Sequence, residues 1–121
     1  MNYLPLLIPV LLLVIGSHAI GAETESDGVL QINGCRIEPD SKCPNANLRG
    51  ADLRNLDMRR MDLSGADLSG ADLRHVNLDL ANLEKAKLRG ANLTRASLQQ
   101  SNLRLADFSG ARLMAIQGWG L

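Results

Sequence analysis

From Ala46 onward, an apolar residue occupies every fifth position of the chain without a break, and fourteen such repeats fill residues 46–115. These central positions hold leucine, or methionine or phenylalanine in its place: Leu48, Leu53, Met58, Leu63, Leu68, Leu73, Leu78, Leu83, Leu88, Leu93, Leu98, Leu103, Phe108 and Leu113. Two residues before each central position stands a small or apolar residue, most often alanine. The pattern therefore marks two inward positions in every repeat.

A period of five fits neither a helix nor a strand. Five steps of about 100° turn a helical side chain by about 140°, and five residues along a strand reverse the face to which a side chain points. The central residues can share one interior only if the chain turns a corner once per repeat. The pattern therefore predicts short extended sides joined by bends, wound into an all-β solenoid that forms the core from these residues.

The number of sides in one coil follows from the residue two after each central position. Glycine recurs there at Gly50, Gly70, Gly90 and Gly110, a spacing of 20 residues, and Gly65 is the one further glycine in this column. Twenty residues are four repeats, so the cross-section is predicted to be a square. The four glycines mark one corner, where φ is positive or backbones approach closely.

The repeats, such as Ala66-Asp67-Leu68-Ser69-Gly70, resemble those of the pentapeptide-repeat family. The resemblance covers 46–115 and implies a right-handed quadrilateral β-helix, here of about three and a half coils. The segment 32–48 looks like the disulfide-braced lead-in of exported members. Departures from the family pattern are Leu56 and Met61 in place of alanine, and Lys87, Ser97 and Arg112 in place of aspartate or asparagine.

The first 22 residues have the character of a secretory signal peptide. They contain no charged residue, and the apolar run 4–15 is followed by small residues that suit cleavage after Ala19 or Ala22. The absence of lysine and arginine before the run leaves an uncleaved N-terminal anchor as the alternative. After cleavage, no stable membrane insertion is expected. The chain then divides into a signal peptide (1–22), a braced lead-in (23–45), the solenoid (46–115) and a C-terminal cap (116–121).

Cys35 and Cys43 are the two cysteines of the chain. In an exported protein they can pair, and closing this nine-residue loop is worth about 2.5 kcal/mol in the chain-entropy model. A zinc site would need two further ligands, and after the leader the chain offers one histidine, His75. We therefore expect a disulfide that pins a short strand and turn, residues 29–34, over the first coil.

The last six residues leave the repeat. Trp119 is expected to lie over the last coil, either as a simple hydrophobic lid or as a contact in a homodimer formed through the C-terminal end.

The stacking of coils also places particular side chains beside one another. Along the faces, Arg54 is expected above Arg74, where the two like charges must splay into solvent. His75 is expected at a different, ordinary corner, so that His75→Val costs much less stability than Gly90→Val.

Charge and composition narrow the classes of function. Thirteen basic and thirteen acidic residues give a formal net charge of zero, which is not the footprint of a nucleic-acid-binding protein. Acidic residues spaced by five fall on different sides of the square, so they form neither a catalytic pair nor a metal cluster. With a single histidine after the leader and both cysteines oxidised, no catalytic, cofactor or metal site is expected.

The sequence therefore favours a non-enzymatic, exported scaffold that uses flat β-helix faces to bind a protein partner not identified by the sequence. Its expected location is the bacterial periplasm or the exterior, or the thylakoid lumen in a photosynthetic organism. The alternative comes from the family resemblance, because some relatives are acidic, dimeric rods that bind DNA topoisomerases in place of DNA. The neutral charge and the leader disfavour it, and an enzyme is disfavoured further.

Overall fold

The computed structural model describes residues 21–118 of the chain. Residues 1–20, which hold most of the expected leader, and residues 119–121, which include Trp119, lie outside the described residues. The described part contains strands, bridges and turns but no helix, and hence no helix that is long and apolar enough to cross a membrane. The chain is thus all-β over 21–118.

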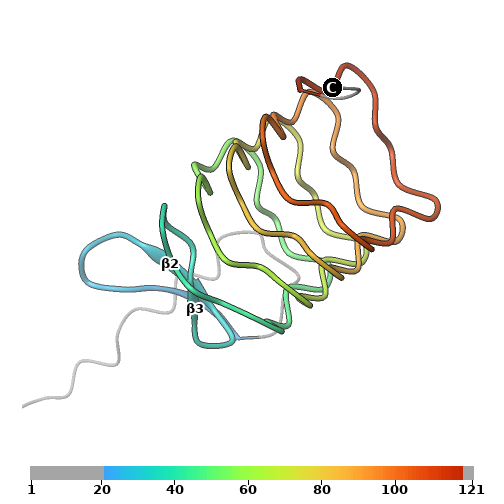
Figure 1. Cartoon of the computed structure of the whole chain (residues 1–121). Coiled ribbons are helices and arrows are strands. Elements are labelled where there is room, and N and C mark those ends of the chain that lie inside the picture. Colours follow the sequence, from blue (N-terminus) through green and yellow to red (C-terminus); the bar gives the residue numbers. More distant parts are fainter. Residues whose placement is uncertain (1–20, 119–121) are drawn as a thin grey trace, which may run out of the picture.

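The body of the molecule is a stack of four-sided coils with a small sheet at one end (Figure 1). Parallel bridges join residues 20 positions apart, from Lys42↔Asp62 at the start to Ser97↔Gln117 at the end. Four repeats therefore make one coil, as the glycine spacing predicted. The architecture is a right-handed quadrilateral β-helix.

The β-helix is longer than the segment drawn from the sequence. Its ladder begins one repeat earlier, at residues 41–45, where Cys43 holds the central position and is buried. It also continues to Gln117, whose N–H donates to the Ala96 carbonyl at 3.0 Å. The bridged region amounts to about four coils rather than three and a half. A cysteine in place of leucine concealed the first of these repeats.

The core is the column of central residues. From Leu48 to Leu93 every central side chain has no exposed surface, and Leu98 is 2% exposed. The alanines two positions earlier fill the space beside them, as at Ala66 and Ala91. Leu103, Phe108 and Leu113 in the last coil are partly exposed, although they pack against the core. The interior is therefore closed by coils on both sides only in the inner part of the stack.

Every corner, and not only the glycine corner, has a positive φ. All residues at the fifth position of the repeat from Asp40 to Ala115 lie between 55° and 69°, including bulky residues such as Leu80 and Arg95. The central carbonyl accepts a hydrogen bond from the N–H three residues later, as in Ala66 N–H to Leu63 O at 3.0 Å. This is the arrangement of a type II β-turn, which requires positive φ at its third residue.

The expectation that His75 sits at an ordinary corner is therefore wrong, since its φ is 59° against 67° at Gly90. A β-branched residue is strained at either position by about 1–3 kcal/mol. We expect Gly90→Val and His75→Val to lower the urea midpoint by similar amounts, and His75→Gly to raise it because glycine tolerates the positive φ. An unchanged midpoint for His75→Val would contradict the corner geometry.

The preference for aspartate and asparagine before the central residue has a local cause. Their side-chain oxygen accepts a hydrogen bond from the N–H two residues later, as Asp62 does from Ser64 at 3.1 Å and Asn92 from Thr94 at 3.1 Å. This bond holds the backbone for the following turn. Where Ser97 interrupts the pattern, Asp79 in the preceding coil accepts the Gln99 N–H at 2.9 Å instead.

The sheet at the N-terminal end consists of three short antiparallel strands in the order β1-β2-β3. They span Ala22–Thr24 (β1), Leu30–Ile32 (β2) and Cys35–Arg36 (β3). The turn between β2 and β3 is Asn33-Gly34, with φ of 48° and 82°. Two positive φ values are the requirement of a type I′ hairpin turn, for which Asn-Gly is the preferred pair.

Candidate functional site

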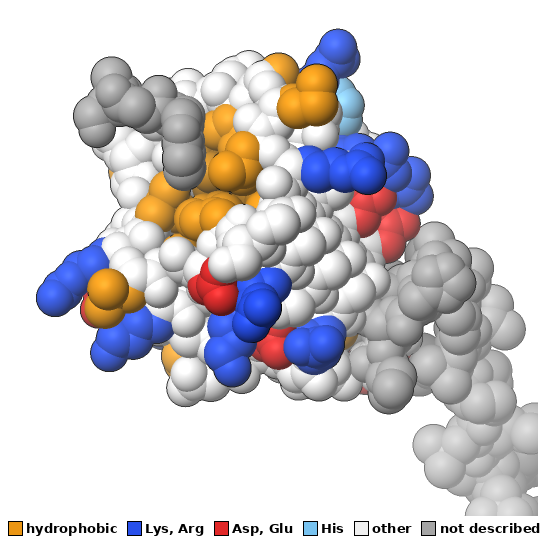
Figure 2. Space-filling view, turned by 90° about the vertical axis from the view of Figure 1, so that its right-hand side faces the viewer, with side chains coloured by type: hydrophobic (Ala, Val, Ile, Leu, Met, Phe, Trp, Pro, Cys, Tyr) orange, Lys and Arg blue, Asp and Glu red, His pale blue; other side chains and the backbone are white. Residues whose placement is uncertain are grey.

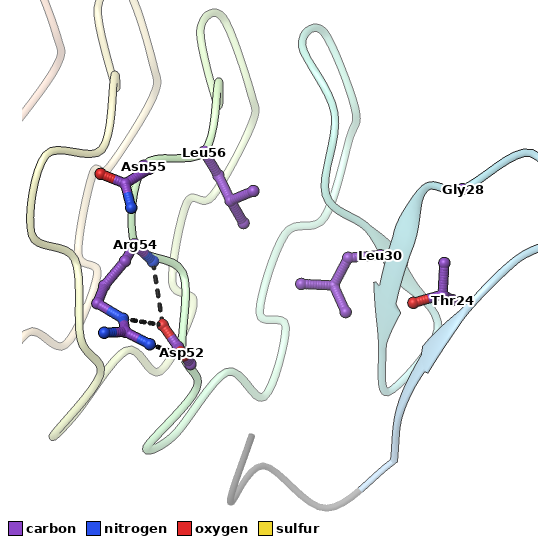
Figure 3. Close-up of a pocket in the computed structure, with 7 residues that line it drawn as sticks. All are labelled: Thr24, Gly28, Leu30, Asp52, Arg54, Asn55 and Leu56. Carbon is purple, nitrogen blue, oxygen red and sulfur yellow. Dashed lines mark hydrogen bonds and ion pairs between the residues drawn. The ribbon is translucent and has the colours of Figure 1, made fainter. Parts of the chain in front are cut away.

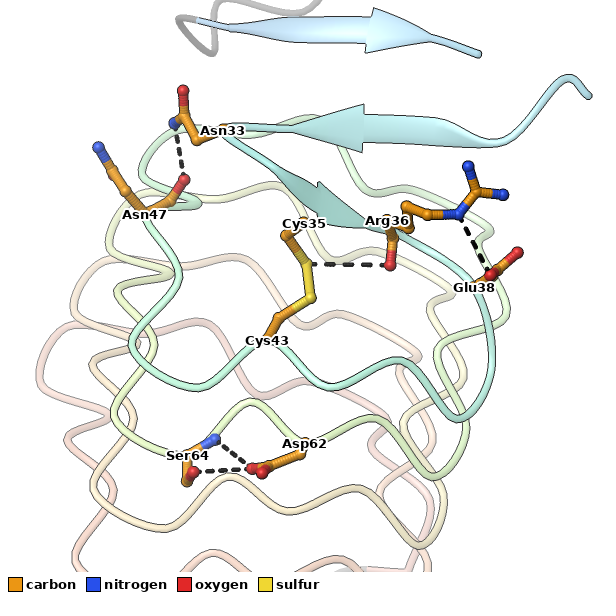
Figure 4. Close-up of a disulfide and its surroundings, with 8 residues drawn as sticks. All are labelled: Asn33, Cys35, Arg36, Glu38, Cys43, Asn47, Asp62 and Ser64. Atoms are coloured by element: carbon orange, nitrogen blue, oxygen red, sulfur yellow. Dashed lines mark hydrogen bonds and ion pairs between the residues drawn. A yellow bond between two sulfur atoms is a disulfide. The ribbon is translucent and has the colours of Figure 1, made fainter. Parts of the chain in front are cut away.

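The N-terminal sheet is joined to the first coil by the disulfide between Cys35 in β3 and Cys43 (Figure 4). Both cysteines are buried together with Ile32 and Ile37. The Asn33 side-chain amide donates to the Asn47 carbonyl at 2.9 Å, so the turn is held to the coil as well. This end of the core is covered by protein.

A pocket of about 430 Å³ lies between the N-terminal sheet and residues 52–56 of the first coil (Figure 3). Leu30 of β2 and Leu56 of the coil face each other across it. Its lining residues are Thr24, Gly28, Leu30, Asp52, Arg54, Asn55 and Leu56. The charged pair at its edge, Asp52 with Arg54, is satisfied internally by two short bonds of 2.8 and 2.7 Å. The pocket is chiefly apolar and contains no nucleophile with a base.

The arginines on the coil faces are paired with aspartates rather than splayed. Arg54 and Arg74 each make two bonds of 2.6–2.8 Å to the aspartate two residues earlier, and Arg59 does the same with Asp57. Arg54 Nε also lies 3.7 Å from a carboxylate oxygen of Asp72 in the next coil. The expected repulsion between Arg54 and Arg74 is therefore offset by alternating carboxylates.

These pairs predict loss of stability in acid. Hydrogen bonds from Arg54, Arg59 and Arg74 have the largest effect on the folded-state pKa of their aspartate partners, and they lower it. Burial acts in the opposite direction and is the smaller effect. A carboxyl whose pKa is lower in the folded state stabilises the fold above the unfolded pKa, about 3.9 for aspartate. That stability disappears as the pH falls through the lowered folded value.

We therefore expect the urea midpoint to be flat from neutral pH to about pH 5 and to fall below about pH 4. Because the arginines are exposed, solvent screens these pairs and each contributes little by itself. The variant Asp72→Asn should show a smaller decrease between pH 5 and pH 2 than the unmodified chain. An identical decrease in both would contradict a role for this pair.

The sites considered for chemistry remain separate. His75 is exposed at a corner, and in residues 21–118 there is no group of three or more histidine, cysteine or acidic residues placed to hold a metal ion. Asp52, Asp57 and Asp62 lie on three successive sides of one coil. The structure therefore does not bring these candidate groups together among the described residues.

The C-terminal end differs from the N-terminal end because the described residues leave it uncovered. Figure 2 shows hydrophobic side chains gathered on this end with lysine and arginine around them. Leu105 and Met114 at its edge are 67% and 70% exposed, and Leu103 and Leu113 inside it are partly exposed. Trp119, for which the sequence suggested a lid or a dimer contact, lies outside the described residues.

The repeat that forms these coils is also the feature that this chain shares with a known protein family. The model of the family described as pentapeptide repeats matches residues 41–79 and 77–114, in eight copies. The chain belongs to the pentapeptide repeat family. This membership accounts for the four-sided coil, and the match begins at residue 41, where the structural ladder also begins.

Solved structures that resemble this chain include two other pentapeptide repeat proteins. A pentapeptide repeat protein from the Arabidopsis thaliana thylakoid lumen is 38% identical with a TM-score of 0.57, over 58% of this chain and 49% of that one. A pentapeptide repeat protein from the cyanobacterium Nostoc is 42% identical with a TM-score of 0.37, over 60% and 64%. The chain thus spans about half the length of the Arabidopsis pentapeptide repeat protein. No curated protein matches the chain.

Proposed function

We propose that this pentapeptide repeat protein is a non-enzymatic, exported scaffold that binds a protein partner. The observation that carries the proposal is the C-terminal end, which residues 21–118 leave uncovered and where Leu105 and Met114 are largely exposed. Exposed clusters of large apolar side chains on a soluble protein are commonly interaction sites. The backbone around them is held by hydrogen bonds between coils, so the surface is presented with little cost in conformational entropy.

Export is supported by two independent features. The disulfide between Cys35 and Cys43 braces the cap, and disulfides persist in oxidising compartments. The Arabidopsis relative is a protein of the thylakoid lumen, which is also reached by export. Cleavage after Ala19 would keep β1 whole, including the bond from Asn33 N–H to the Gly21 carbonyl.

The DNA-mimic alternative has less support. It requires a rod whose acidic groups are available to a basic partner. Here Asp52, Asp57 and Asp72 are each bonded to an arginine by two short hydrogen bonds. Their charge is neutralised within the rod, so the faces do not imitate a polyanion.

Export and partner binding can be tested separately in the native cells. Recovery of the chain with an antibody should yield a mature N-terminus at Ile20 or Glu23 and linked cysteine peptides by mass spectrometry. A chain that retains Met1 and carries two free thiols would contradict export.

For partner binding, we suggest a photo-crosslinking amino acid at exposed positions, one at the C-terminal end (Leu105) and others on the faces (Arg60 and Arg89). The expected result is a discrete adduct with another protein from at least one position. Absence of any adduct from all positions, in cells that produce the folded chain, would contradict the scaffold function.

A further inference from the structure

The hydrogen bonds between coils give the β-helix a direction. Each repeat donates two backbone N–H groups to the following coil and receives one from it. On one side of the square, Leu68 N–H donates to Lys87 O at 2.7 Å and Gly70 N–H to Arg89 O at 2.8 Å, while Lys87 N–H returns to Ala66 O at 2.8 Å. The C-terminal edge of any coil is consequently rich in donors.

In the last coil this edge has no next coil to pair with among residues 21–118. On the three sides 101–105, 106–110 and 111–115, the N–H groups that would donate to a following coil and have no partner among residues 21–118 are those of Leu103, Leu105, Gly110, Leu113 and Ala115, and the carbonyls that would accept from it are those of Ser101, Ala106 and Ala111. Five donors stand against three acceptors. Unpaired N–H groups carry partial positive charge and attract anionic or carbonyl oxygens.

The side-chain charge also becomes more positive toward the C-terminal end, where the backbone edge is rich in donors. Residues 21–79 hold 7 basic and 11 acidic residues, a net charge of −4, whereas residues 80–118 hold 6 basic and 2 acidic residues, a net charge of +4. Arg104 and Arg112 flank the edge directly, and the Arg104 side chain is 74% exposed. The chain is neutral as a whole but strongly bipolar along the axis of the solenoid.

We infer that the C-terminal end of the β-helix binds an extended, acidic segment of a partner protein. The segment follows the edge of the last coil around its corners as a further partial coil: its carbonyl oxygens accept from the free N–H groups, its apolar side chains cover Leu103 and Leu113 on opposite sides of the square, and its carboxylates face Arg104 and Arg112. This inference rests on the proposed scaffold function and names the surface and the chemistry of the partner.

A second copy of the chain fits this surface less well. Two C-terminal ends facing each other would bring together two donor surpluses and two basic rims, so donors would lack acceptors and like charges would meet. The acidic N-terminal end, which has the complementary charge, is covered by β1, β2 and β3. A lipid surface supplies anionic groups but no regular row of acceptors to match the directional N–H groups.

The test uses the mature, oxidised chain labelled with nitrogen-15 and two synthetic ten-residue peptides. One alternates valine and glutamate, and the other alternates valine and lysine. We expect the valine–glutamate peptide to shift the amide signals of Leu103, Leu105, Gly110 and Leu113 and to slow their hydrogen exchange. The valine–lysine peptide should leave them unchanged, and added salt should weaken the binding.

The matched variants are Arg104→Glu with Arg112→Glu, at the edge, and Lys42→Glu, at an exposed position in the first coil. The double variant should weaken binding of the valine–glutamate peptide at least about tenfold, which corresponds to about 1.4 kcal/mol. Lys42→Glu should leave the affinity unchanged. Circular dichroism and urea midpoints establish that both variants are folded.

Each of five results would overturn the inference, and the first four come from the peptide experiments and from sedimentation. They are no binding of the valine–glutamate peptide, equal binding of both peptides, binding at another place such as the pocket beside Leu30, and protection of the same amides by self-association in sedimentation experiments. A fifth is tighter protection by phosphatidylglycerol vesicles than by the peptide. A crosslinked partner found on a coil face would leave the scaffold function standing while this inference fails.

Discussion

Leu73→Ala is expected to be the most destabilising single substitution considered, at about 3–5 kcal/mol. Leu73 is fully buried, with Leu53 and Leu93 at the equivalent positions of the coils before and after it, and both are also fully buried. Removal of its side chain leaves a cavity that the hydrogen-bonded coils on both sides cannot collapse to fill. Urea unfolding of the full chain should show this as a large decrease in the midpoint.

Leu113→Ala provides the matched control, because Leu113 occupies the same side of the square in the last coil. It is partly exposed and packs against the core from one side, so its truncation should cost about 1–2 kcal/mol. Equal costs for the two substitutions would mean that the last coil is covered in solution by something beyond the described residues.

Removal of the disulfide is expected to have the second largest effect. Replacement of Cys35 and Cys43 by alanine should destabilise the chain by about 2–4 kcal/mol, through the greater freedom of the unfolded chain and the loss of two buried side chains. The effect should be greatest at the N-terminal end, since each coil contacts only its neighbours. Hydrogen exchange should therefore accelerate in residues 30–48 more than in residues 83–98.

Reduction of the unmodified chain with dithiothreitol offers an independent comparison. It should produce nearly the same change in hydrogen exchange as the alanine substitutions, although each cysteine side chain gains only one hydrogen atom. Uniform acceleration of exchange over all coils would show instead that the β-helix unfolds as a single unit and that the cap is part of that unit.

Much of the fold could be predicted because one physical requirement repeats. A side chain such as Leu68 must point inward at each turn of the chain, and a period that fits no straight element therefore reveals a corner. The spacing of Gly50, Gly70 and Gly90 then gave the number of sides. Both inferences depend on residue size and backbone freedom, which can be read directly from residue type.

The backbone conformation at the corners was harder to predict from the sequence. Leu80, Lys85 and Arg95 have positive φ although their residue types disfavour it. Their N–H groups donate to carbonyls of the next coil, and those partners lie about 20 residues away in sequence. The same long-range pairing gives Arg54 a second carboxylate, from Asp72, which a reading of one repeat at a time does not reveal.

The N-terminal sheet and the polarity of the two ends were also missed in part. The sequence indicated a strand and turn at 29–34, but β1 lies at the boundary of the expected leader and has no apolar alternation to mark it. The basic character of the later repeats was visible in the sequence. Its coincidence with a donor-rich backbone edge required the hydrogen-bond directions.

The four-repeat coil also limits how such a chain can change in length. Insertion of five residues, for example after Gly70, keeps every later leucine inward but turns all later faces by a quarter of a coil. Asp72 would no longer lie under Arg54, and Gly90 would leave the corner of Gly70. Insertion of 20 residues returns every later residue to its own side and corner of the square, with one new coil between the former neighbours. Gain or loss of whole coils is therefore the change in length that this protein can accommodate while the surfaces at its two ends keep their mutual orientation.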